Sequence, residues 1–138
     1  MSKRTTLESE VQRQIEAAIG AESDFLLLRN SVGLATHFDD KSGKTWRVPY
    51  GLGTGSPDLV GMLRVGPCLS AWVALEVKCP GEEAEPHQAV VHDQWRAFGA
   101  LVYVVHSAGE ARMALATARL AVWLAAEAHA AGHMAGAT

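Results

Sequence analysis

The stretch from Asp58 to Lys78 constrains the fold more than any other part of the sequence. Two apolar runs, 59–63 and 71–75, flank a turn-prone segment, which is a pattern typical of a β-hairpin. Antiparallel pairing of the runs places Asp58, before the first strand, close to Glu76, at the end of the second. Because side chains alternate between the two faces of a strand, Glu76 and Lys78 point the same way. The sequence therefore predicts one cluster of Asp, Glu and Lys side chains.

Two carboxylates beside so apolar a strand need a partner, because burial of an unpaired carboxylate is strongly unfavourable. A divalent cation is one such partner, and Mg²⁺ and Mn²⁺ favour oxygen ligands. The predicted ligands are Asp58, Glu76 and the backbone carbonyl of Val77. Lys78 would then position or deprotonate an attacking water and offset charge on a phosphate. The alternative is that Asp58 caps a turn, while Glu76 and Lys78 end a strand in solvent.

Several separated motifs carry a resemblance to a known family. Pro57-Asp58, Glu76-Val77-Lys78 after an apolar strand, and Gln88 ten residues beyond Lys78 resemble the motifs of the PD-(D/E)XK nuclease superfamily. The match is closer to its VRR-NUC family, the virus-type replication-repair nuclease domain, in segments 50–61, 76–81, 86–88 and 99–107. This resemblance covers roughly residues 7–111. It implies an α/β fold with a restriction-endonuclease-like core, in which helices flank a central mixed β-sheet.

The resemblance also implies the domain organisation and two further catalytic residues. The chain would be a single domain, 1–138, in which residues 112–138 form a C-terminal helical extension. Glu8 lies on the apolar face of a helix predicted over 7–19, and family resemblance makes it a further metal ligand. Glu10 is held in reserve for that ligand position. Without the resemblance, Glu8 is interpreted as a residue at the solvent rim or as a partner of the helix dipole. Gln88 matches a family glutamine beside the active site, where it would hold the water or a substrate phosphate.

The function that the resemblance implies is metal-dependent, structure-specific hydrolysis of DNA phosphodiesters. Stand-alone phage and bacterial members of the family suggest a Holliday-junction resolvase-like enzyme that acts as a homodimer on branched DNA in the cytoplasm. The implied cofactor is Mg²⁺ or Mn²⁺. One alternative is a non-catalytic nucleic-acid-binding module that retains the fold. Another is an α/β domain unrelated to DNA, which only the net charge of −3 supports.

Candidate DNA contacts lie between the first strand, predicted over 25–29, and the hairpin predicted over 34–50. Arg29 and Asn30 either contact phosphate or belong to a plain turn. Basic side chains in and beside the polar loop of this hairpin either contact phosphate or face solvent, and they are Lys41, Lys44 and Arg47. Trp46 either stacks on a base or packs against the protein.

The remaining segments predict a crossover helix, a strand and a closing helix. The helix over 88–97 is expected to turn Val91, Trp95 and Phe98 inward and to connect the Glu76 strand to a parallel strand over 101–105. A helix over 109–129 follows, with the large apolar residues Met113, Leu120 and Leu124 on one stripe, which packs either on the open face of the sheet or against a second subunit. Trp123, beside that stripe, either joins the core or anchors an interface.

Composition removes several other functions. The segment 51–56 lacks a Gly-Lys-Ser/Thr ending and leads into a strand, so no nucleotide cofactor is predicted. The longest apolar run, 120–126, is too short to span a membrane, and no signal peptide is evident. Two cysteines without Cys-x-x-Cys spacing are expected to be reduced thiols. All six histidines are interpreted as structural or surface residues, because their spacing matches no metal site.

Overall fold

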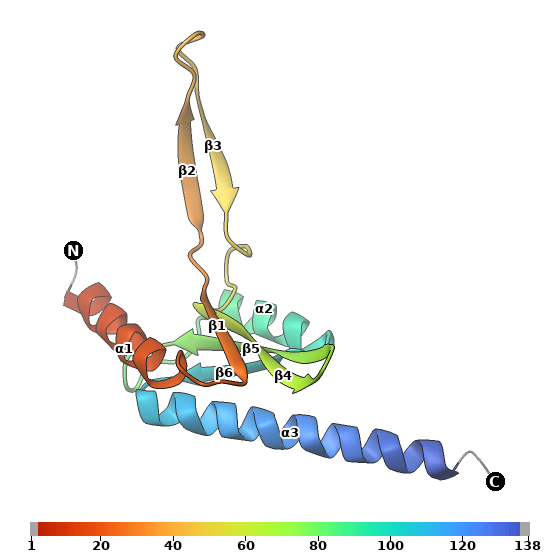
Figure 1. Ribbon diagram of the computed structural model, residues 1–138. Coiled ribbons are helices and arrows are strands. Elements are labelled where there is room, and N and C mark those ends of the chain that lie inside the picture. The colour runs from red at the N-terminus through yellow and green to blue at the C-terminus, as the bar shows by residue number, and fades with distance from the viewer. Residues whose placement is uncertain (1–2, 136–138) are drawn as a thin grey trace.

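The computed structural model describes residues 3–135, with the side chains of residues 7–130. Three helices and six strands follow one another in this part of the chain: α1 (Lys3–Ile19), β1 (Phe25–Arg29), β2 (Gly33–Phe38), β3 (Thr45–Tyr50), β4 (Leu59–Gly66), β5 (Leu69–Val77), α2 (Pro86–Ala97), β6 (Leu101–Val105) and α3 (Ala108–Ala135) (Figure 1). None of these helices is long and apolar enough to cross a membrane.

The central sheet has the strand order β1-β4-β5-β6. The pairs β1–β4 and β4–β5 are antiparallel, whereas β5 and β6 are parallel and α2 forms the crossover between them. The predicted mixed sheet is therefore confirmed. In the β4–β5 hairpin, Leu59 is paired with Leu75, so Asp58 and Glu76 lie one position further along at the same end of the sheet.

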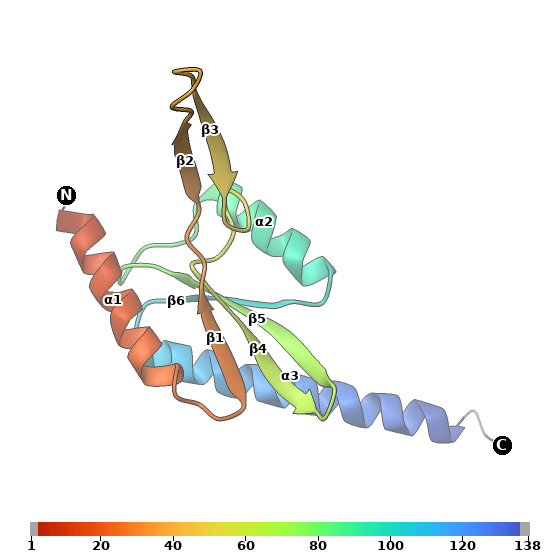
Figure 2. The same cartoon turned by 45° about the horizontal axis from the view of Figure 1, so that its top comes forward.

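Helices cover both faces of this sheet. On one face α1 and α3 pack together, and their residues Ile15, Ile19 and Leu115 join Leu59 and Leu75 in the larger core. The smaller core on the opposite face contains Val60, Ala74 and Val102, with Trp95 of α2 packed against them. Figure 2 shows α2 and α3 on opposite sides of the sheet. Because Glu76 is two residues from Ala74, its side chain lies on the α2 face.

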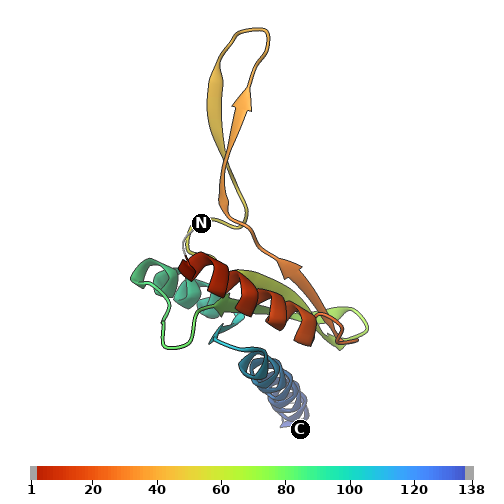
Figure 3. The same cartoon turned by 90° about the vertical axis from the view of Figure 1, so that its left-hand side faces the viewer.

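The strands β2 and β3 form a separate two-stranded sheet, which confirms the predicted second hairpin. This hairpin stands away from the rest of the molecule (Figures 1 and 3), and every residue of β3 is exposed. Large apolar side chains on it are therefore in contact with solvent, namely Leu34, Phe38, Trp46, Val48 and Tyr50.

Of the two positions expected for the apolar stripe of α3, the one in the core is wrong. Met113, Leu120 and Leu124 are exposed, whereas Leu115 and three small residues face the core, Ala111, Ala114 and Ala118. Small side chains let α1 approach α3 closely, so the buried face lacks the bulky periodic residues on which sequence reasoning relied. The helix also extends to Ala135, beyond the predicted end at 129, and its C-terminal part runs past the edge of the sheet (Figure 1). Trp123 is exposed, and it lies near Leu63 and Arg64 of β4.

The inward direction expected for Phe98 is also wrong, because its exposed fraction is 95%. The helix α2 ends at Ala97, and Phe98 has the non-helical angles φ −92° and ψ 10°. Its side chain therefore leaves the helical periodicity that would have carried it inward. The buried residue of α2 is instead His92.

Candidate active site

The hairpin register brings together the acidic and basic residues at one end of the sheet. Asp58 Oδ2 accepts a hydrogen bond from the backbone N–H of Val77 at 2.8 Å, which ties the start of β4 to the end of β5. Glu76 Oε1 lies 2.9 Å from Lys78 Nζ and 2.5 Å from Gln88 Nε2. The structure thus places four of the five predicted catalytic side chains in one connected group.

Gln88 links this group to the start of α2. Its Oε1 accepts a hydrogen bond from the backbone N–H of Glu85 at 2.8 Å, while its Nε2 donates to Glu76. The first contact satisfies a donor before the first helical turn, and the second holds a carboxylate on β5. Gln88 therefore has one orientation that serves both the helix start and the carboxylate.

Burial makes the two strand carboxylates difficult to ionise. Glu76 is fully buried and Asp58 is half-buried. Burial raises the pKa of Glu76, against the lowering effect of Lys78 and Gln88. Burial also raises the pKa of Asp58, and the nearby charge of Glu76 adds to this effect. A positive charge between these groups would favour their ionised forms.

Lys78 supplies part of that positive charge. Burial lowers its pKa, but the hydrogen bond and charge of Glu76 outweigh this effect, so the pKa of Lys78 is raised overall. Glu8 on α1 belongs to the same electrostatic group, since its charge raises the pKa of both Glu76 and Lys78. Three carboxylates thus act on a single ammonium group, which leaves negative charge to be neutralised.

The glycine-rich loop before Asp58 is held by Asn30. The Nδ2 group of Asn30 donates to Ser56 Oγ and to the carbonyl of Pro57, each at 2.8 Å. Its Oδ1 accepts from the backbone N–H of Leu52 at 3.2 Å. Asn30 therefore fastens the loop that leads to Asp58. Its amide oxygen and nitrogen are both engaged in these contacts, which favours the turn interpretation of Asn30 over phosphate contact.

Three of the other predicted DNA contacts lie apart from the carboxylates, whereas Arg29 is paired with Leu59, the residue after Asp58. Lys41, Lys44 and Arg47 are exposed on the projecting β2–β3 hairpin, and Arg29 is exposed at the end of β1. A cleft of about 740 Å³ connects the root of this hairpin to the carboxylate cluster. Its walls include Tyr50, the glycine-rich loop, Asp58 and Gln88, and none of the described residues around it is a lysine or an arginine.

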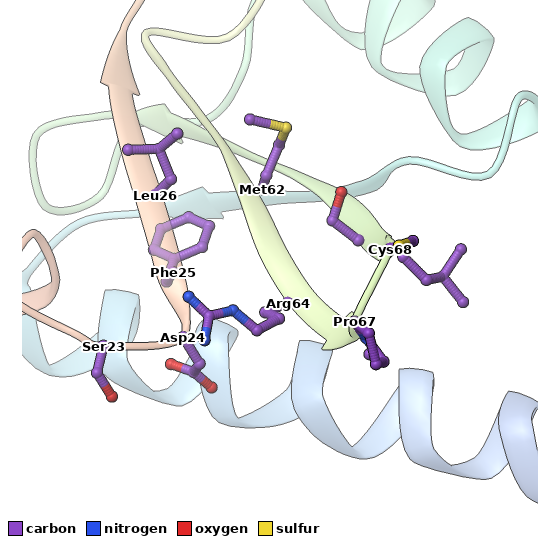
Figure 4. Close-up of a pocket in the computed structure, with 11 residues that line it drawn as sticks. Ser23, Asp24, Phe25, Leu26, Met62, Arg64, Pro67 and Cys68 are labelled. Atoms are coloured by element: carbon purple, nitrogen blue, oxygen red, sulfur yellow. The ribbon is translucent and has the colours of Figure 1, made fainter.

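A second hollow, of about 530 Å³, lies at the opposite end of β4 (Figure 4). Asp24 and Arg64 are its charged residues. Asp24 is already paired with Arg119 of α3, through contacts of 2.8 and 2.6 Å. The described residues around this hollow include none of the predicted catalytic residues.

Sequence reasoning missed His92, which the structure places against Glu76. The ring is fully buried, and its Nε2 lies 3.3 Å from Glu76 Oε2. Burial lowers the pKa of His92, and the charges of Arg96 and Lys78 add to this. The available signal was the spacing from Gln88, because residues four apart lie on the same face of a helix.

The donor set fits a hard divalent cation, although it is small. Within the described part of the chain, no group of three or more His, Cys, Asp and Glu side chains is arranged to hold a metal ion. The two strand carboxylates are nevertheless adjacent, with raised pKa values, and Glu76 Oε2 has no regular hydrogen-bond partner among the described residues. Carboxylate oxygens with a backbone carbonyl and water are the ligands that Mg²⁺ and Mn²⁺ accept.

The sheet order and the helices on both faces define a mixed α/β fold with a central mixed sheet. A solved structure described as a "VRR_NUC domain" is similar to the chain over 79% of its length and over 94% of the solved chain, with a TM-score of 0.52 and 23% sequence identity. The likeness confirms the VRR-NUC-like fold expected from the sequence motifs. Comparison with family models and with curated proteins gives no match.

Proposed function

We propose that the protein is a metal-dependent DNA endonuclease. The observation that carries this proposal is the β4–β5 register, which sets Asp58 beside Glu76 while Lys78 and Gln88 both contact the Glu76 carboxylate. Asp58, Glu76 and the carbonyl of Val77 would hold Mg²⁺ or Mn²⁺, and Glu8 would complete the ligand set. When bound, such an ion supplies Lewis-acid stabilisation of the phosphate and lowers the pKa of a coordinated water.

The protein's own residues would prepare the substrate for attack. Lys78 Nζ lies 2.9 Å from Glu76 Oε1, and its ammonium group would donate to the attacking water or to a phosphate oxygen and offset negative charge. Gln88, held by the start of α2, orients the same water through its amide group. The negative carboxylates would repel the phosphate of the substrate unless a cation is present, which makes substrate binding depend on the metal.

DNA would reach the cluster through the cleft at the root of the β2–β3 hairpin. Lys41, Lys44 and Arg47 are exposed beyond this cleft and would contact phosphates, with Arg29 closer to the sheet. A two-stranded β-ribbon is narrow enough to enter the major groove of duplex DNA. Asn30 would act indirectly, by holding the loop before Asp58.

We further propose a homodimer that acts on branched DNA, including four-way junctions. A two-fold dimer matches the symmetry of such a junction. The exposed apolar side chains of α3, Leu120, Trp123 and Leu124, provide a surface suited to a second copy. A sedimentation mass of one subunit, with full cleavage of junctions, would rule the dimer out.

The deciding experiment compares cleavage of labelled duplex, flap and four-way-junction DNA with Mg²⁺, Mn²⁺ or EDTA. We expect cleavage only with metal, and loss of cleavage in Glu76→Gln and in Lys78→Ala. Glu83→Gln, in the exposed loop after β5, is the matched control and should cut normally. Cleavage that persists in EDTA would contradict the proposal.

A non-catalytic nucleic-acid-binding module is the second candidate. The small number of grouped metal ligands in the described part of the chain favours it. Such a module would bind the same DNA without cutting it, whether or not metal is present.

A further inference from the structure

The contact between His92 and Glu76 joins two buried polar groups that lack other partners among the described residues. Both residues have an exposed fraction of 0%. Glu76 Oε2 and His92 Nε2 lie 3.3 Å apart, yet neither forms a regular hydrogen bond with a described residue. An unsatisfied buried polar group is unfavourable and rare. Two such groups facing each other therefore call for a function.

The surroundings of the carboxylate show what His92 adds. Glu76 Oε1 already receives Lys78 Nζ and Gln88 Nε2, whereas Oε2 points to the ring of His92. Oε1 thus contacts Lys78 at the strand end and Gln88 in the first turn of α2. Oε2 lies beside His92 in the next turn of α2. A donor on each of its two oxygens would prevent the carboxylate from rotating about its last side-chain bond.

We propose that His92 is a positioning residue, which donates from Nε2 to Glu76 Oε2 and holds that carboxylate in the orientation that binds the divalent cation. The inference rests on the proposed metal site. Groups that hydrogen-bond to metal-binding carboxylates and histidines commonly change metal affinity by about 10- to 100-fold when they are removed. The chemistry required of position 92 is one N–H donor at the reach of an imidazole Nε2.

Two substitutions of the same chemical type test this requirement. Glutamine carries its amide nitrogen about as far from the backbone as histidine Nε2, whereas asparagine carries it at the position of Nδ1. His92→Gln should therefore keep the interaction with Glu76, and His92→Asn should lose it. His92→Leu removes the donor while it fills most of the space, and thermal unfolding of each full-length variant establishes that it folds.

The measurement is the dissociation constant for Mn²⁺, obtained from the electron paramagnetic resonance signal of the free ion. We expect His92→Asn and His92→Leu to weaken Mn²⁺ binding by about 10- to 100-fold, and His92→Gln to stay within about threefold of the unchanged protein. Equal Mn²⁺ affinity in the unchanged protein and in folded His92→Asn would overturn the inference. Electron spin-echo modulation from a directly bound nitrogen would also overturn it, because His92 would then be a ligand.

The same titration separates this inference from the proposed function. If the unchanged protein binds Mn²⁺ in an Asp58-dependent manner without cutting DNA, the endonuclease proposal fails, and the role of His92 is still decided by its variants. If the unchanged protein binds no Mn²⁺, both proposals fail together. If it binds Mn²⁺ and cuts DNA while all three variants bind equally well, only the role of His92 fails.

Discussion

The end of the central sheet and the β2–β3 hairpin use charged side chains in opposite ways. At the sheet end, Glu76 and Lys78 are buried, and their side chains contact each other and residues of α2. On the hairpin, Lys41, Lys44 and Arg47 are exposed on a two-stranded sheet. The first region therefore holds charges in defined positions for chemistry, whereas the second presents charges that can follow a partner.

The largest expected effect follows from Asp58→Asn at the sheet end. Loss of this charged ligand should lower metal-dependent cleavage by about 10³-fold, while the amide oxygen can still accept from Val77. Gel assays with the junction substrate measure this loss. The same effect from a triple hairpin variant, Lys41→Ala, Lys44→Ala and Arg47→Ala, would break the distinction between the two regions.

The same substitution should stabilise the ion-free protein. Burial raises the pKa of Asp58 above its ordinary value of 3.8. The stability that this group contributes is complete below that value and is lost as pH rises through the folded-state pKa. At about pH 7.5, the ionised Asp58 therefore lowers the free energy of unfolding of the unchanged protein, and Asp58→Asn lacks this loss. Thermal unfolding with and without Mg²⁺ should show a gain from Mg²⁺ in the unchanged protein alone.

A pair of leucine substitutions compares the packing of the two regions. Leu63 on β4 has an exposed fraction of 1%, whereas Leu34 on β2 has 58%. Leu63→Ala should lower the free energy of unfolding by about 2–5 kcal/mol, and Leu34→Ala should change it by no more than about 0.5 kcal/mol. Denaturant unfolding measures both changes. A loss for Leu34→Ala as large as that for Leu63→Ala would show that the hairpin is covered in solution.

The hairpin charges should act on DNA affinity and leave stability unchanged. For each DNA phosphate that the triple hairpin variant no longer neutralises, the slope of log affinity against log salt should fall by about 0.9 for duplex DNA. Fluorescence anisotropy at several salt concentrations measures this slope, with Arg112→Ala on α3 as a control for net charge. An unchanged slope would remove the hairpin from the proposed DNA path.

The smallest expected effect concerns the loop between β5 and α2. His106 Nδ1 lies 2.8 Å from Glu110 Oε2, and its Nε2 lies 2.7 Å from the carbonyl of Glu82. The hydrogen bond to Glu110 is the largest cause of the raised pKa of His106, and His106 in turn lowers the pKa of Glu110. His106 thus holds the loop between β5 and α2 in place, whereas the tip of the β2–β3 hairpin is exposed.

The sign of both shifts defines the pH window of this contact. Stability from His106 is complete below its ordinary value of 6.5 and is lost as pH rises through its raised pKa. Stability from Glu110 is present above its ordinary value of 4.5 and is lost as pH falls through its lowered pKa. His106→Gln should therefore lower the free energy of unfolding most between these two pH values and little in alkaline buffer. A cost that does not depend on pH would show that the ring acts only through packing.

Sequence reasoning predicted a residue's position where that position follows from a local pattern or from the family resemblance. Alternation along β4 and β5 placed Glu76 and Lys78 on one face, and the ten-residue offset placed Gln88 at the start of α2, where it contacts Glu76. It failed at Phe98, because this residue follows Ala97, the last residue of α2, and does not continue the helical periodicity. It also failed at α3, because small alanines form the buried face and the bulky residues face solvent.

The sequence alone determined the pairing of β4 with β5 and the meeting of Asp58 with Glu76, since strand alternation and turn residues specify these features locally. Only the tertiary structure decided the burial of His92 against Glu76 and the projection of the β2–β3 hairpin. Both depend on how separate elements pack. His92 is buried because α2 packs over the sheet, and the β2–β3 hairpin projects because no element of the described part of the chain covers β3. Packing between elements has no fixed spacing in the sequence, so local patterns could not reveal it.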